Sequence, residues 1–399
     1  MKRVLIFILI ISWLTSGRSQ EGNISEVYDL NVTAPSPNSA ALGEYADVPV
    51  SLYTGTPNIS IPIQTFQGKH LSVPVSLSYH GSGIKVDEIA SNVGLGWALN
   101  AGGVITRTVY GLPDEAALGF RNQPDLSLGF NSVLLEEAAR GRIDAQPDMF
   151  FFNFQGSSGK FVLSNTGEIL VVPYQDIKIE LGNGLEIWTI TTPDGVIYTF
   201  GGEGAIEKTL PNSFYCEDEQ NPDNEEITSW YLKTIEHPSG EIITFDYGNA
   251  DIQYISNVRQ SQSFPRYNTC PDCSFNTIVE TCAQQSNVSS KYLRKISGST
   301  GSIEFAYSSR EDLPGGVKLD TISCRGTNGQ AYREVTLSYD YFDSPGRSAI
   351  ENVSGITVDP DQIRKRLKLQ AVYIGEQLTP PYRLEYNEDG DYQLPPRFS

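Results

Sequence analysis

The sequence predicts an all-β protein built as a meander of successive antiparallel hairpins, and three observations support this fold class. Apolar and polar residues alternate with a period of two in several stretches, glycine turns separate these stretches, and helical periodicity is scarce. Tyr, Phe and Gly occur 21, 17 and 36 times, whereas Met occurs twice and His three times. Residues 131–139, closed by Gly141, are the best candidate for a helix, and that helix would be short.

The first predicted hairpin pairs residues 59–63 with residues 71–79. Every second position in both stretches is apolar, and the turn between them lies near Gly68. Pro62 and Pro74 both fall on the polar register. Because proline has no N–H to donate to a strand ladder, we expect these to be edge strands.

Further hairpins follow along the chain. Residues 150–154 lead through the turn 156–159 into residues 161–163, and residues 177–181 turn at 182–184 into residues 185–188. A third turn, Pro193-Asp194-Gly195, returns the chain into residues 196–200. Asn-Gly and Asp-Gly between alternating stretches are strong hairpin signals, so these segments extend the predicted meander.

Residues 91–107 form an unusual run in which glycines flank a tryptophan and alternate with apolar residues. Such glycines are typical of places where the backbone turns or packs more closely than a side chain would allow. The run has no catalytic group, so we interpret it as a structural motif. Its defining positions are Gly94, Gly96, Trp97, Gly102 and Gly103.

An internal repeat has two clear copies that lie 61 residues apart. In each copy, a Tyr-Leu-x-x-Ile segment precedes a glycine, and the next strand ends in Phe-x-Tyr. A hairpin of this kind cannot close its own core and must stack on its neighbours. Residues 383–386, after Leu369 and Val372, are a candidate degenerate third copy. The repeat positions are Tyr231, Ile235, Gly240, Phe245 and Tyr247 in the first copy and Tyr292, Ile296, Gly301, Phe305 and Tyr307 in the second.

The glycine-tryptophan run and the repeats together resemble the N-terminal region of bacterial RHS/YD-repeat proteins and of the B component of insecticidal toxin complexes. The resemblance extends over most of residues 35–399 and is most specific at 45–107 and 147–202. It implies hairpins that wind into a hollow β-shell, which encloses or presents a variable C-terminal effector or acts at the cell surface. The sequence departs from that pattern because the Tyr-Asp turn is not evident and only two copies are clear. We therefore expect an N-terminal portion of a longer protein or a truncated gene.

The predicted organisation has four parts. Residues 1–19 are a signal peptide, and residues 20–44 are an extended lead segment. Residues 45–205 form a β-sandwich-like N-terminal domain, and residues 206–399 form the degenerate repeat region, incomplete at its C-terminus. A cysteine-bearing insertion at about 255–290 interrupts the repeats.

The chain begins with the features of an exported protein. Lys2 and Arg3 precede an apolar run over residues 4–14, and small residues follow up to the expected cleavage after Ser19. Removing residues 1–19 leaves 26 basic and 48 acidic residues, a net charge of −22. That charge argues against nucleic acid or anionic lipid as a partner. No later segment is long and apolar enough to cross a membrane, so we expect the mature chain to be secreted or at the cell surface.

Five cysteines lie within one stretch of 109 residues. In an exported protein their default state is disulfide-bonded, with one thiol left over. A zinc site is the alternative, because two of them have ligand spacing, but a fourth ligand is missing nearby and His237 lies far away in sequence. The candidate disulfide residues are Cys216, Cys270, Cys273, Cys282 and Cys324.

No motif marks this chain as an enzyme. It has no Gly-x-Ser-x-Gly elbow, no His-Glu-x-x-His and no phosphate-binding loop, so we predict no catalytic residue and no cofactor. His70, His80 and His237 have no companion motif, and structural or surface roles are expected for them. Calcium binding is a weak alternative: the stretch 217–226 is acidic enough for it but is interpreted as a solvated loop, and the stretch 387–391 lacks the spacing and closing Glu of a calcium loop.

These observations predict a non-catalytic exported β-scaffold, the N-terminal region of an RHS/YD-repeat protein with a toxin-like architecture. Its partners would be a longer C-terminal shell or effector region, or surface proteins and glycans. The alternative function is an extracellular glycan- or protein-binding module that uses exposed aromatic residues such as Trp188 and Trp230. A secreted hydrolase of unrecognised type is a third hypothesis.

Overall fold

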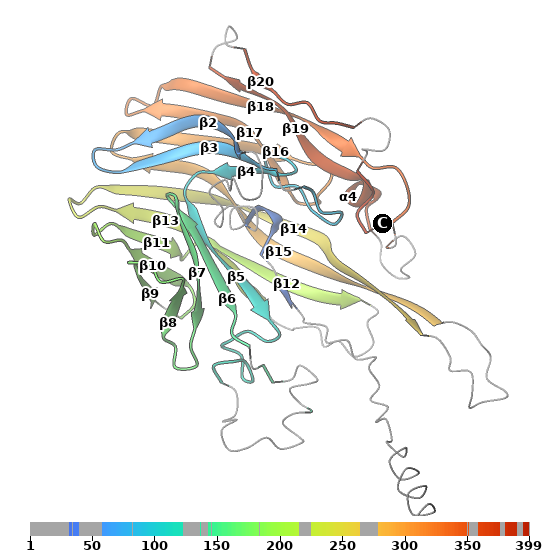
Figure 1. Cartoon of the computed structure of the whole chain (residues 1–399). Helices are drawn as coiled ribbons and strands as arrows, with labels where there is room; N and C mark the ends of the chain where they lie inside the picture. The colour runs from blue at the N-terminus through green and yellow to red at the C-terminus, as the bar shows by residue number, and fades with distance from the viewer. Residues whose placement is uncertain are drawn as a thin grey trace, which may run out of the picture.

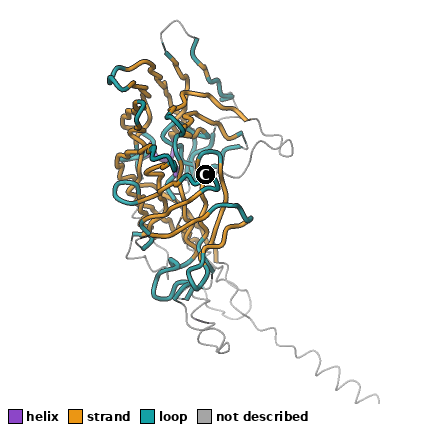
Figure 2. Tube along the Cα trace, turned by 90° about the vertical axis from the view of Figure 1, so that its left-hand side faces the viewer, coloured by secondary structure: helices purple, strands orange, loops and turns teal. Residues whose placement is uncertain are grey.

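The computed structural model describes residues 32–33, 35–39, 58–81, 83–122, 136, 143–144, 146–182, 184–214, 225–263, 278–348, 350, 358–375, 380–388 and 394–398. Nearly all of its regular structure is strand, which confirms the all-β prediction (Figure 2). The strands are β1 Val32–Thr33, β2 Asn58–Gln67, β3 Ser72–His80, β4 Trp97–Asn100, β5 Gly103–Tyr110, β6 Met149–Phe154, β7 Ser157–Leu163, β8 Ile169–Val172, β9 Lys178–Gly182, β10 Ile187–Thr191, β11 Ile197–Gly201, β12 Ile206–Phe214, β13 Glu226–Glu236, β14 Ile242–Ser263, β15 Ile278–Gly298, β16 Gly301–Ser309, β17 Val317–Gly326, β18 Ala331–Asp343, β19 Lys365–Ile374 and β20 Tyr382–Arg383. The helix α4 spans Pro360–Arg364, and Asp359 caps its N-terminus by accepting a hydrogen bond from the Asp361 N–H.

Consecutive strands pair antiparallel along most of the chain. Strands β5 to β8 form one meander and β13 to β20 form a second (Figure 1). Strand β13 joins the two, because it also pairs with β5, β11 and β12. Hydrogen bonds thus connect residues on both sides of the predicted domain boundary at 205, and that boundary stays a prediction.

The predicted hairpins are present with small changes in their turns. Strands β6 and β7 turn at Gln155 and Gly156, so residues 157–159 belong to β7 rather than to the turn. Strand β10 pairs with β9 on one side and with β11 on the other. The alternation of apolar residues therefore identified these strands correctly.

Strands β2, β3 and β4 form a separate three-stranded sheet. Strand β2 is an edge of this sheet, as Pro62 predicted. Strand β3 is the central strand, so the prediction that it is an edge strand is wrong. Pro74 lies beyond the part of β3 that pairs with β4, so its missing N–H breaks no ladder bond there. In Figure 1 this sheet lies across the strands of the second meander, and the Phe66 ring packs on Gly298 at the end of β15.

Strands β14 and β15 are 22 and 21 residues long and pair along almost their whole length. They project as a two-stranded arm in Figure 1. The two ends of the predicted insertion at 255–290 are therefore strand, not loop, and β12 pairs with β15 along the arm. Residues 264–277, with Cys270 and Cys273, lie outside the described residues.

Aromatic rings from β6, β7, β10 and β13 pack together in the core among its aliphatic side chains. Phe150 stacks on Phe161 with ring centroids 5.0 Å apart, and both rings contact Trp188. Trp188 and Trp230 are 0 % exposed and meet edge to face at 5.9 Å. The prediction that these tryptophans are exposed ligand-binding residues is therefore wrong, because cross-strand packing buries both rings.

Three other predictions fall mainly outside the described residues: the signal peptide at 1–19, most of the lead segment at 20–44, and the helix at 131–139, of which Glu136 alone is described and is helical. In the part of the chain that is described, no helix has the length and apolarity needed to cross a membrane.

Candidate functional site: the seam between the repeats and the glycine-rich segment

Four repeat units stack side by side in the second meander, and each combines a leucine on its first strand with a tyrosine on or just after its second. Three of these tyrosines interrupt the strand register with a β-bulge. Each of the three also lies opposite the leucine of the next unit. The units are unit 1 with Leu232 and Tyr247, unit 2 with Leu293 and Tyr307, unit 3 with Leu319 and Tyr339, and unit 4 with Leu369 and Tyr386.

The tyrosine hydroxyls tie the two strands of a unit together. Tyr247 donates to the Leu232 carbonyl at 2.7 Å, and Tyr339 donates to the Leu319 carbonyl at 2.7 Å. In unit 4, Tyr386 donates to the carbonyl of Leu369 at 2.9 Å. A buried hydroxyl is stable only with a hydrogen-bond partner, so in these three units the bond holds the tyrosine against the first strand.

The sequence pattern revealed units 1 and 2 and suggested unit 4, but unit 3 was missed. A signal was present, since Leu319-Asp320-Thr321-Ile322 repeats the Leu-x-x-Ile spacing and Leu337-x-Tyr339 replaces Phe-x-Tyr. Unit 3 lacks the preceding tyrosine, and its leucine and tyrosine are farther apart in sequence than those of units 1 and 2, which hid it. The strand register makes the equivalence evident.

The glycine-rich segment, residues 91–103, runs along the repeat units and contacts them through its backbone. A β-carbon on Gly94 would lie 3.0 Å from the backbone nitrogen of Leu369 in unit 4. A β-carbon on Gly102 would lie 3.1 Å from the Phe245 ring in unit 1. Both glycines have positive φ, +112° and +118°, which favours glycine independently of the space. The motif is glycine-rich because it is pressed against the repeats.

Hydrogen bonds add to this close packing. Leu319 donates its N–H to the Asn92 carbonyl at 2.9 Å, and Leu95 donates to the Leu367 carbonyl at 2.8 Å. Trp97 is buried, and its indole N–H donates to the Tyr386 hydroxyl at 3.0 Å. The predicted structural motif and the suspected last repeat therefore meet directly.

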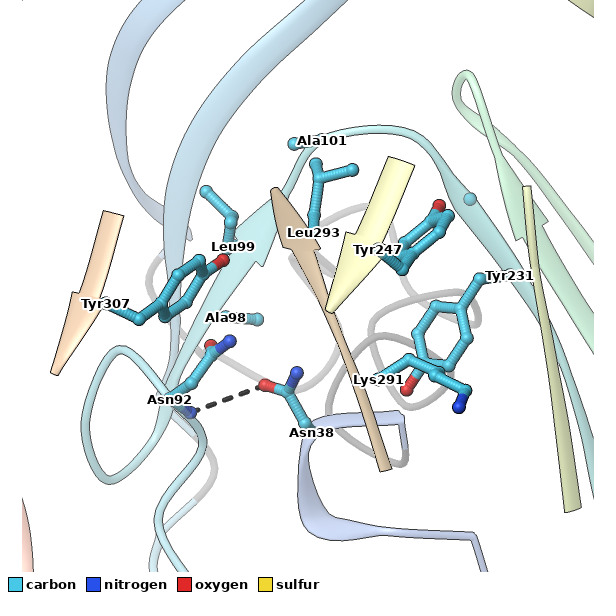
Figure 3. A pocket seen from close by; sticks show the side chains of 11 residues that line it. Asn38, Asn92, Ala98, Leu99, Ala101, Tyr231, Tyr247, Lys291, Leu293 and Tyr307 are labelled. Carbon is cyan, nitrogen blue, oxygen red and sulfur yellow. Dashed lines mark hydrogen bonds between the residues drawn. The ribbon is translucent and has the colours of Figure 1, made fainter. Parts of the chain in front are cut away.

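Unit 2 differs from the others at a small cavity of about 30 Å³ between the segment and the repeats (Figure 3). The hydroxyl of Tyr307 is buried there and has no hydrogen-bond partner among the described residues, and neither has Oδ1 of Asn92. On the same cavity wall the Asn92 N–H donates to Oδ1 of Asn38 at 3.3 Å. Among the described residues, the tyrosine bond of units 1, 3 and 4 is missing from unit 2.

A buried ion-pair cluster lies just after the glycine-rich segment. The guanidinium of Arg107 is 0 % exposed and donates to Asp148 at 2.5 and 2.9 Å and to Glu115 at 2.6 and 2.9 Å. Asp148 also accepts the N–H groups of Tyr110 and Asp114. Burial lowers the pKa of Arg107, but the bonds and charges of Glu115 and Asp148 outweigh burial and raise it. This cluster joins β5, β6 and the loop at 111–122.

Two carboxyl groups beside this cluster have strongly shifted pKa values. Burial, followed by the charge of Asp148, raises the pKa of Asp114 to about 7. Burial and the charge of Glu115 raise the pKa of Glu226 to about 7. The Oδ2 atom of Asp114 has no partner among the described residues. Neither group lines the cavity beside Tyr307.

Glu207 on β12 forms a second buried polar centre, which holds the short segment 35–39. Its carboxyl oxygens accept from the Ser36 N–H at 2.9 Å, the Ser36 hydroxyl at 2.5 Å and the Ser290 hydroxyl at 2.9 Å. Ser229 and Tyr231 donate to the same carboxyl group, and Ser39 bonds to Ser229. Glu207, Ser36 and Ser39 are all fully buried. The lead segment is thus anchored between the strands at this point.

The remaining predicted residues have diverse surroundings. Cys324 is a free, buried thiol in the core, while the side chains of the other four cysteines lie outside what the structure describes, so their disulfides stay a prediction.

The rings of His70 and His237 stack with their centroids 4.8 Å apart, a contact that the sequence pattern did not predict. Glu388, in one of the two calcium candidates, pairs with Lys368 at 2.8 Å. Among the described residues no three His, Cys, Asp or Glu side chains are arranged to hold a metal ion.

Comparison with known proteins gives structural neighbours only. No protein-family model matches the chain, and no curated protein matches it. A crystal structure of TcdB2-TccC3-Cdc42 is 13% identical and has a TM-score of 0.40; the match covers 83% of this chain and 16% of that one. A crystal structure of TcdB2-TccC3 is 14% identical with a TM-score of 0.40, covering 89% and 16% of the two chains.

A third neighbour is the N-terminal domain of effector protein SpvB from Salmonella typhimurium strain LT2. It is 10% identical with a TM-score of 0.36, and the match covers 80% of this chain and 99% of that domain. The chain therefore spans about a sixth of the TcdB2-TccC3 polypeptides and nearly all of the SpvB domain.

Proposed function

We propose that this chain is a non-catalytic, exported β-scaffold that acts as the N-terminal region of an RHS/YD-repeat type protein and presents or encloses a downstream effector. The observation that supports this most is the arrangement of the repeats. Units 1 to 3 each place their tyrosine opposite the leucine of the next unit, so the array grows by adding equivalent hairpins. The glycine-rich segment then holds the array together by close backbone contact.

The buried charged groups support the same proposal. Arg310 donates to both oxygens of Asp312 and to the carbonyls of Ala90 and Ser91, at the start of the glycine-rich segment. Asp312 in turn accepts the Leu367 N–H at 2.8 Å. These groups fasten the segment to units 2 and 4, which is a structural use of charge.

Two measurements on the native product test this proposal. An antibody to residues 45–107 should detect the protein outside the cytoplasm, and a charge placed in the apolar leader, Leu9→Arg, should abolish export. The band should lie far above the 44.0 kDa of this chain. A native band slightly below 44.0 kDa would contradict the scaffold proposal and favour a self-contained binding module.

A binding module is the second candidate function, and one observation favours it. An open cleft lined by tyrosines and carboxyl groups lies beside the last repeat unit. The buried Trp188 and Trp230 play no part in it.

A further inference from the structure

An aromatic cleft lies where the three-stranded sheet meets the last repeat unit. Its volume is about 560 Å³, within the range of small-molecule sites. Four aromatic residues line it: Tyr79 from β3, Tyr341 and Phe342 from β18, and Tyr386 from unit 4. Phe342 is buried, so the three tyrosines supply the accessible ring surface. Such a density of rings in an open, partly polar cleft provides stacking surface for a small ligand.

Two of these rings are held in place by hydrogen bonds within the protein. The Tyr386 hydroxyl donates to the Leu369 carbonyl and accepts the indole N–H of Trp97. The Tyr341 hydroxyl accepts the N–H of Glu311 at 2.8 Å. A ring that is fixed before binding loses little conformational freedom on binding.

Polar side chains line the same cleft. Asp343 and Asn387 are exposed there, and their side chains make no hydrogen bond to another described residue. Their carboxylate and amide groups can accept from, and in the case of Asn387 donate to, hydroxyl groups of a ligand.

Two lysines, Lys365 and Lys368, lie among five carboxyl groups around the cleft, so the charge there is negative and both ammonium groups are paired. Glu388 is paired with Lys368 at 2.8 Å, and the Lys368 ammonium also lies 5.1 Å from the centre of the Phe342 ring. The Lys365 ammonium lies 5.7 Å from the centre of the Tyr341 ring and is paired with Glu311 and Asp361. An anionic ligand would meet this acidic excess, and a cationic ligand would meet the Lys365 and Lys368 ammonium groups beside the Tyr341 and Phe342 rings. A neutral polyhydroxylated ligand needs neither charge to be compensated.

We propose that this cleft binds a neutral sugar residue of a glycan, with its C–H-bearing face against the aromatic rings and its hydroxyls bonded to Asp343 and Asn387. The C–H groups of a pyranose complement the electron-rich face of an aromatic ring. The proposal deepens the binding-module alternative and is independent of the scaffold proposal, since a scaffold of any length can contain this cleft.

The test is binding of the full chain to an array of neutral mono- and disaccharides, followed by calorimetric titration with the best of them. We expect saturable binding that weakens about tenfold or more in Tyr341→Ala and in Asn387→Ala. The matched control is Tyr174→Ala, which removes a tyrosine that is 84% exposed and lies outside the cleft, and should bind as the wild type does. Thermal melting of each variant checks that the fold is kept, and Asn387→Ala removes no hydrogen bond to a described residue.

Three results would overturn the proposal: no saturable binding to any neutral sugar, equal binding by wild type, Tyr341→Ala and Asn387→Ala, or tighter binding of tetramethylammonium than of any sugar. The last result would identify a cation site instead. None of them bears on the export or size of the native product, so failure here is distinguishable from failure of the scaffold proposal.

Discussion

The hydroxyl of Tyr247 donates to the carbonyl oxygen of Leu232 at 2.7 Å across the two strands of the first repeat unit. The same bond recurs in units 3 and 4, while the equivalent hydroxyl in unit 2, on Tyr307, is buried without a partner among the described residues. The repeat thus offers an internal comparison in which the same substitution removes a hydrogen bond in some units and none in another.

Tyr→Phe substitutions should change the free energy of unfolding differently in different repeat units. Tyr247→Phe and Tyr339→Phe each remove a buried hydrogen bond from a tyrosine hydroxyl to a strand carbonyl, so each should lower the free energy of unfolding by about 1–2 kcal/mol. Tyr307→Phe removes an unpartnered hydroxyl and should be neutral or stabilising. Urea denaturation of the three variants measures this, and equal losses in all three would contradict the assignment.

Gly94 should tolerate no side chain. Gly94→Ala adds a β-carbon 3.0 Å from the Leu369 backbone at a φ of +112° and should cost roughly 2–3 kcal/mol or more. Gly329→Ala is the matched control, because Gly329 also has positive φ but has open space around it, and it should cost about 1 kcal/mol. Thermal melts compare the two, and equal costs would show that backbone conformation alone matters.

Stability should fall as the pH rises towards neutrality because of Asp114. Its pKa is raised from 3.8 to about 7 in the folded chain, so the folded state binds a proton that the unfolded state releases. This contribution is fully present below about pH 4 and is lost as the pH rises through 7. Each pKa unit is worth about 1.4 kcal/mol, so we expect a loss of roughly 2 kcal/mol or more.

Asp114→Asn should remove the share of that pH dependence that comes from Asp114, since an amide cannot titrate, and should leave the share of Glu226, whose pKa is also raised to about 7. Urea unfolding at pH 5 and pH 8 provides the measurement. Asp176→Asn, at an exposed carboxyl group, is the control and should keep the wild-type slope. A wild-type chain that is more stable at pH 8 than at pH 5, with Asp114→Asn parallel to it, would rule out the assignment.

Glu207 should hold the segment 35–39 in place. Glu207→Ala removes the acceptor for Ser36, Ser229 and Ser290, so amide hydrogen exchange at residues 36–39 should become faster. Glu203→Ala, on an exposed neighbour, should leave exchange unchanged. Unaltered protection in Glu207→Ala would mean that other contacts anchor the segment.

Cys324 should be recovered as a free thiol. Burial raises its pKa, which further slows reaction of the folded protein with iodoacetamide. Mass mapping of peptides without reduction should find Cys324 alkylated only after unfolding, and the other cysteines as candidates for disulfides. A disulfide-linked peptide that contains Cys324 would contradict the structure.

Much of the strand content could be predicted from local patterns. Ile59, Ile61 and Ile63 alternate with polar residues, and Pro193-Asp194-Gly195 marks a tight turn, so these hairpins depend on neighbours in sequence. Unit 3 was missed because its Leu319 and Tyr339 are 20 residues apart and lack the flanking Tyr and Phe of units 1 and 2.

Local sequence patterns were sufficient for the fold class, most hairpins and the structural character of the glycine-tryptophan run, because period-two alternation and turn chemistry depend on neighbouring residues. Long-range packing alone established that Gly94 makes room for Leu369, that Glu207 holds Ser36, and that Tyr79, Tyr341 and Tyr386 line one cleft. These partners lie tens to hundreds of residues apart, and no local pattern specifies which strand stacks on which. The same packing buries Trp188 and Trp230. The alternation of apolar and polar residues in their strands did not show whether these two side chains are buried or exposed.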